Sequence, residues 1–211
     1  MHKNSTTATL RTVETAFLAS TASLLWLINY YFPIGPLLRI FFPIPIALVY
    51  LRWGSRASWM SAIISGLLLS VLMGPTRSIV FLMPYGFMGV QLGMCWKRDA
   101  SWLFSLFTGG LIDSIGLFFR FWLFSLLLGD DLWRLVITQV TEFAEWVFLK
   151  LNIFLQPNFE IIQLLAISLI LVQSFVYLLV VHLVAFYLFE RLGNPISKPP
   201  QLIQIILALH D

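Results

Sequence analysis

The sequence predicts an all-α integral membrane protein, a bundle of six transmembrane helices. Hydrophobic residues make up 59% of the 211 residues and charged residues only 11%, whereas soluble domains carry about 25% charged residues. Several apolar runs approach the ~20 residues that cross ~30 Å of hydrocarbon. The formal net charge of +3 comes from basic residues scattered at the ends of these runs, without a nucleic-acid motif. We therefore expect a lipid bilayer as the surroundings and no nucleic acid as a partner.

The predicted bundle covers residues 15–191, between a polar N-terminal tail (1–14) and a C-terminal tail (192–211). Its six apolar runs are residues 15–32, 37–51, 57–73, 78–96, 101–129 and 161–189. The first run is longer than the 7–15 apolar residues of a signal peptide, and no small-residue cleavage site follows it. We interpret it as an uncleaved first span, with a transit peptide as the alternative.

The second run contains Pro43 and Pro45. Two prolines this close do not fit an unbroken helix, so the second span is predicted to be kinked or discontinuous. Arg39 lies near its start. Two interpretations are open for this arginine: it snorkels to the headgroups at a helix end, or it belongs to a broken helix that lines a cavity.

The segment 130–160 mixes acidic and basic residues with aromatic and aliphatic ones. This pattern predicts an amphipathic outer helix at the membrane interface, with a seventh span as the alternative. With six spans and a cytoplasmic N-terminus, eight basic loop residues lie inside and three outside, which favours six spans with both termini cytoplasmic.

A polar stripe runs along the predicted span 101–129. Its members follow at steps of four, four, three and four residues and share one helix face: Ser105, Gly109, Asp113, Gly116 and Arg120. A carboxylate at the centre of a span costs about 2.5 to 3.5 kcal/mol, so Asp113 is expected to face protein or water rather than lipid. Arg120 is a candidate ion-pair partner, although the two residues are about 10 Å apart along the helix.

The predicted topology places Arg39, Arg77 and Arg120 in the outer half of the bundle, with Asp113 below them. These four residues are the candidate ligand-binding site, a polar pocket for a small anionic solute. The alternative is that each arginine reaches the headgroups separately while Asp113 bonds a neighbouring helix, Arg120 or a serine. The sequence shows no nucleotide-binding or hydrolase motif, and the lone Cys95 cannot build a cysteine-based metal site. We therefore expect no enzymatic activity and assign no cofactor.

The stretch PYGFMGVQLGMCWKR (84–98), in which Gly89 and Gly93 form a GxxxG pair, resembles the YybS-like family of predicted membrane proteins. The resemblance covers roughly residues 57–120. That family is similar in topology to the substrate-binding S components of energy-coupling-factor transporters, which use small residues on their first helix to contact a membrane partner. The face formed by Ala16, Ala19, Ser20 and Ser23 fits such a surface, with serine where alanine is expected. No vitamin-specific motif is present, so no substrate carries over.

Two functions follow from these patterns. The first is a non-catalytic solute-binding or transport subunit, and the second is a scaffold or assembly factor for a larger membrane complex. Both imply other membrane protein subunits as partners. The aromatic-rich, lysine-poor composition looks like cyanobacterial or plastid proteins, so we expect a bacterial inner membrane or a thylakoid.

Overall fold

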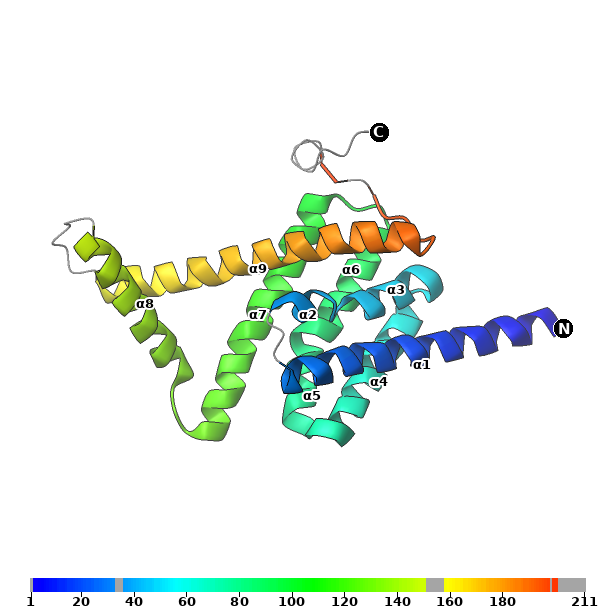
Figure 1. The fold of residues 1–211 in the computed structure, drawn as a ribbon, viewed down its shortest axis with the longest axis horizontal. Helices are drawn as coiled ribbons and strands as arrows, with labels where there is room; N and C mark the ends of the chain where they lie inside the picture. The colour runs from blue at the N-terminus through cyan, green and yellow to red at the C-terminus, as the bar shows by residue number, and fades with distance from the viewer. Residues whose placement is uncertain (1, 33–35, 151–157, 198, 201–211) are drawn as a thin grey trace.

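The computed structural model describes residues 2–32, 36–150, 158–197 and 199–200 (Figure 1). All regular elements in these ranges are helical. In chain order they are α1 (His2–Tyr31), α2 (Pro36–Ile40), α3 (Ile44–Trp53), α4 (Ser55–Met73), α5 (Pro75–Phe81), the π-helical turn η1 (Leu82–Gly86), α6 (Phe87–Lys97), α7 (Trp102–Leu128), α8 (Leu132–Lys150) and α9 (Phe159–Arg191).

Four stretches of helix in the described part of the chain are long and apolar enough to cross a membrane: Ser55–Met73, Pro75–Lys97, Trp102–Leu128 and Phe159–Arg191. The protein is therefore an all-helical integral membrane protein. The helices α2 and α3 fall outside this group because they have only five and ten residues, and α1 falls outside it because no stretch of it is both long and apolar enough. The count of six spans stays a prediction.

Residues 41–43 separate α2 from α3. Pro43 is the N-cap of α3 and Pro45 lies in its first turn, where the missing N–H of proline removes no hydrogen bond within the helix. The chain therefore starts a new helix at Ile44 and leaves Arg39 on the short helix before it. Whether α2 and α3 together act as one broken span stays a prediction.

Glycines on α6 allow α3 to approach closely. A Cβ atom on Gly89 would lie 2.8 Å from the carbonyl oxygen of Pro43, and one on Gly93 would lie 2.9 Å from that of Ala47. Both distances are too short for a real Cβ, so only glycine fits at either position. The GxxxG pair of the sequence is thus the surface on which α3 packs, as is typical of helix contacts in lipid.

The small-residue face of α1 is only half available to a partner. The Ser23 hydroxyl donates to the Ser65 carbonyl oxygen of α4 at 3.1 Å, and the Ser65 hydroxyl donates to the Ala19 carbonyl oxygen at 3.0 Å. Ala19 and Ser23 are buried by this contact, while Ala16 and Ser20 remain exposed. The protein's own α4 therefore covers half of the predicted partner surface.

The helix α8 and the first half of α9 form a pair that diverges from the rest of the bundle (Figure 1). Ile137 of α8 packs against Ile162 and Ala166 of α9. The helix α8 begins where the amphipathic outer segment is predicted, and it is not among the four candidate spans. The predicted segment continues into residues 151–157, which lie outside the described part of the chain.

Candidate functional site

Asp113 is buried at the centre of the bundle, with only 1% of its surface exposed. The polar stripe of α7 faces inward, because Ser105, Gly109 and Gly116 on the same face are also buried. Gly116 is required for this arrangement: a Cβ at this position would lie 2.4 Å from the Pro84 ring. The glycine lets α7 approach η1 and so places the carboxylate inside protein rather than in lipid.

The ion-pair partner of Asp113 is Arg39 of α2. One guanidinium nitrogen, Nη2, lies 3.2 Å from Oδ1 and 3.4 Å from Oδ2 of the carboxylate. The Ser174 hydroxyl of α9 donates to Oδ2 at 2.9 Å. Of the partners that the sequence left open for Asp113, another arginine and a serine are the ones in contact, whereas Arg120 has no hydrogen bond or ion pair among the described residues. Two turns of helix separate the residues, and Arg39 on another helix is within reach.

Two tyrosines hold Arg39 in place. Its guanidinium carbon lies 4.7 Å from the centre of the Tyr177 ring and 5.7 Å from that of Tyr85. The Tyr177 hydroxyl donates to the backbone carbonyl of Arg39 at 3.0 Å. Cation–π contacts of this kind strengthen when they are shielded from water. The Arg39 Nε atom is buried and has no hydrogen-bond partner in the described structure, so the guanidinium retains a free donor.

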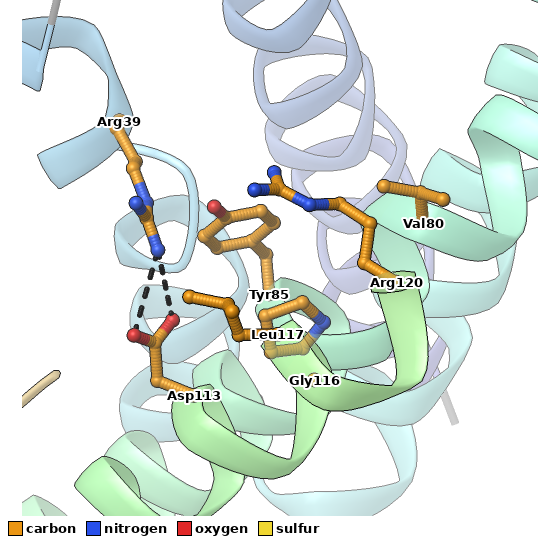
Figure 2. Close-up of a pocket in the computed structure, with 8 residues that line it drawn as sticks. Arg39, Val80, Tyr85, Asp113, Gly116, Leu117 and Arg120 are labelled. Carbon is orange, nitrogen blue, oxygen red and sulfur yellow. Dashed lines mark hydrogen bonds and ion pairs between the residues drawn. The ribbon is translucent and has the colours of Figure 1, made fainter. Parts of the chain in front are cut away.

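A small cavity of about 10 Å³ lies beside the ion pair. Its lining residues are Arg39, Val80, Pro84, Tyr85, Asp113, Gly116, Leu117 and Arg120. The volume is about that needed by one water molecule. In Figure 2 the Tyr85 ring lies between the Arg39 and Arg120 side chains, and the Arg120 side chain extends toward this ring.

The charges around the cavity do not balance. Arg39 and Arg120 contribute two positive charges and Asp113 one negative charge, which leaves a net charge of +1 among the lining residues. A cationic excess of this kind attracts an anion, and guanidinium groups bind the planar oxygens of carboxylate or phosphate particularly well.

Arg77, the fourth predicted site residue, lies elsewhere. Its guanidinium carbon is 3.9 Å from the centre of the Tyr30 ring, and its Nη2 donates to the Tyr30 hydroxyl. Arg77 thus links α5 to the end of α1 and does not line the cavity. The structure brings Arg39, Asp113 and Arg120 together and leaves Arg77 apart.

A second polar contact joins α7 and α9 further along the same stripe. The Ser105 hydroxyl lies 2.8 Å from Nε2 of the buried His182, and His182 Nδ1 lies 2.9 Å from the Leu178 carbonyl oxygen. Because a carbonyl oxygen can only accept, Nδ1 carries the proton and Nε2 accepts from Ser105. His182 lies about 12 Å along α9 from Ser174, so it does not take part in the Asp113 site.

The contacts between α7 and α9 follow a regular register. Ser105 meets His182, a Cβ at Gly109 would meet Leu178 at 2.9 Å, and Asp113 meets Ser174. Sequence reasoning missed Ser174, Tyr85 and Tyr177. A signal for Ser174 was present, because Ser174, Leu178 and His182 follow at steps of four and match the steps of the stripe on α7.

Fold and site together define an all-helical integral membrane protein with an ion pair buried between its helices. Residues 20–208 match the model of the predicted membrane protein family DUF2232, and the chain belongs to this family. No curated protein and no solved structure matches the chain. In the described part of the chain, no three His, Cys, Asp or Glu side chains are grouped so that they could hold a metal ion.

Proposed function

We propose that the protein is a non-catalytic solute-binding subunit of a membrane transport system, and that its ligand presents one anionic group to Arg39 and Arg120. The observation that carries the proposal is the excess of one positive charge at a cavity within the bundle. Charged side chains at membrane depth are costly and usually serve a function. An excess of this kind attracts an anionic ligand.

The position of the cavity favours a path by which the ligand enters from the end of the bundle at which α7 ends. Arg120 lies eight residues before the end of α7, which corresponds to about 12 Å of helix. Arg39 belongs to a five-residue helix, so it can shift without moving a long element. If both termini are cytoplasmic, as the charge distribution predicts, this end is the outer side. The resemblances to the YybS-like family and to S components stay part of the proposal.

Purification of the full chain from its native membrane tests this function. We expect mass spectrometry to find a small anionic molecule bound to the wild-type protein and to Arg77→Gln, which removes a cation outside the cavity. The same molecule should be lost from Arg120→Gln. An anion that is retained equally by Arg120→Gln, or no bound anion in any of the three proteins, would contradict the proposal.

A scaffold or assembly factor is the second candidate, and α8 favours it. Ile137 is the buried residue of this helix, while Phe143, Trp146 and Leu149 are exposed. Such a surface suits a partner subunit as well as lipid. A photo-crosslinking residue at position 143 should give a protein adduct in native membranes if the chain is a scaffold, and lipid adducts alone if it is not.

A further inference from the structure

Both members of the ion pair, Arg39 and Asp113, line the cavity. The cavity of about 10 Å³ has room for about one water, which is less than a carboxylate or phosphate group requires. An anionic group can therefore enter only if a lining side chain moves. Asp113 is fixed on the 27-residue helix α7, whereas Arg39 combines a long side chain with a short helix. Of the two members of the ion pair, Arg39 is the one that can move.

The geometry of the ion pair favours such an exchange. A strong arginine–carboxylate pair uses two nitrogens in parallel at about 2.7 to 2.9 Å. Here one nitrogen, Nη2, serves both carboxylate oxygens at 3.2 and 3.4 Å, and Nε has no partner in the described structure. Arg39 thus binds Asp113 through a single nitrogen, which is weaker than the two-nitrogen arrangement. It keeps hydrogen-bond donors for a second anion.

Asp113 cannot remain charged if Arg39 leaves it. The charged and titratable groups around it in the described structure are Arg39 of α2, Tyr85 of η1, Tyr177 of α9 and Arg120 of its own helix. With Arg39 and Arg120 both turned to a ligand, no cation remains for the carboxylate, and an unpaired charge buried at 1% exposure is strongly disfavoured. Protonation removes this penalty.

Ser174 suits both states of the carboxyl group. Its hydroxyl lies 2.9 Å from Oδ2 and donates to the carboxylate. A hydroxyl can also accept a hydrogen bond, so the same serine can accept the O–H of protonated Asp113 after a rotation of its own hydrogen. The contact from α9 therefore survives the change of charge.

We infer that Asp113 and the oxyanion of a bound ligand are alternative partners of Arg39, and that Asp113 takes up one proton when Arg39 turns to the ligand. The inference rests on the proposed function. The proton comes from the solvent and forms an O–H bond on Asp113, while both arginines stay protonated. For a monoanion the net charge of the site is +1 before and after binding, so binding is electroneutral. The ligand group is a carboxylate or a phosphate, either free or at the head of a lipid.

The test measures binding of radiolabelled acetate and sulfate, which stand for carboxylate and phosphate, to the full chain in phosphatidylcholine nanodiscs. Neither probe changes its charge between pH 6 and 8.5. If one proton binds with each anion, wild-type affinity should fall by up to about tenfold per pH unit toward high pH. In Asp113→Asn the neutral side chain does not compete with the anion for Arg39 and needs no proton. This variant should therefore bind the anion more tightly than wild type at pH 8.5, and its affinity should not depend on pH. Glu14→Gln, which breaks the Arg52–Glu14 ion pair outside the cavity, should behave as wild type.

The outcomes separate the inference from the proposed function. Wild-type binding that does not depend on pH overturns the inference and leaves the function standing. Absence of binding by both probes at every pH contradicts both. If Asp113→Asn does not fold, calorimetry of the wild-type protein in two buffers of different ionisation enthalpy still counts the protons taken up per anion. Nanodiscs that contain phosphatidylglycerol distinguish a free anion from a lipid headgroup as the ligand. If the lipid headgroup occupies the site, this lipid will displace sulfate.

Discussion

Arg39 and Asp113 are 74 residues apart in the chain and meet inside the bundle at 3.2 Å. Breaking a buried pair by removing one partner leaves the other charge uncompensated, which costs about 3 to 5 kcal/mol. We expect Asp113→Ala to lower the free energy of unfolding in mixed micelles by about 3 kcal/mol, the lower end of this range, because the Arg39 side chain is 24% exposed.

The double variant Asp113→Ala with Arg39→Met should recover part of that loss, with a coupling of at least about 1 kcal/mol in a double-mutant cycle. Glu14→Gln serves as the control, because it breaks an ion pair whose side chains are 31% and 19% exposed, and we expect it to cost about 1 kcal/mol or less. Additive losses in the cycle, or a stability unchanged by Asp113→Asn, would show that the ion pair does not stabilise the fold.

Gly116 is expected to tolerate no side chain. An added Cβ would lie 2.4 to 2.8 Å from three carbons of the Pro84 ring, and a ring on the backbone cannot rotate away. Gly116→Ala should therefore destabilise the protein by about 1 to 3 kcal/mol, as overpacking does. Gly86→Ala is the matched control, because its Cβ would come no closer than 3.4 Å to a neighbour. Equal melting temperatures for the two variants would contradict the close contact between α7 and η1.

The Ser105–His182 hydrogen bond is expected to stabilise the contact between α7 and α9. Ser105→Ala leaves the buried His182 Nε2 without its partner at 2.8 Å, and such a loss costs about 1 to 3 kcal/mol. Ser114→Ala is the control on the same helix, because the Ser114 hydroxyl donates only to the Gly110 carbonyl one turn back and its removal should change little. Unfolding free energies of both variants in the same detergent decide the comparison.

Membrane topology can be read from cysteine labelling in a Cys95→Ala background. Arg52 donates to the Leu192 carbonyl and Lys97 to the Tyr50 carbonyl, so the ends of α3, α6 and α9 lie together. By the positive-inside rule this end is cytoplasmic. A membrane-impermeant maleimide added from outside should label Thr76→Cys and Asp131→Cys, but Arg98→Cys and Arg191→Cys only after permeabilisation. Labelling of positions 131 and 191 from the same side would refute six spans.

The polar stripe on α7 could be predicted because it depends on helix geometry alone. Steps of three and four residues place Ser105, Gly109, Asp113 and Gly116 on one face, and the structure buries all four. The high cost of a carboxylate in lipid was sufficient to predict that this face turns inward.

The partners of Asp113 could not be predicted from the same reasoning. Arg120 is a neighbour along one helix, whereas Arg39 and Ser174 come from α2 and α9, and a single sequence does not state which helices pack together. Arg77 shows the same limit, because its contact with Tyr30 depends on how α1 packs beside α5. Its charge and its predicted depth in the membrane do not distinguish Arg77 from Arg39 and Arg120 at the cavity.

The most direct test of the central claim is an experimental structure determined with selenate, an anion whose anomalous scattering locates it without ambiguity. We expect one anomalous peak within hydrogen-bond distance of both the Arg39 and Arg120 guanidinium groups, with Arg39 no longer bonded to Asp113. A structure at the same selenate concentration with no peak at the cavity, and with the Arg39–Asp113 ion pair intact, would contradict the account.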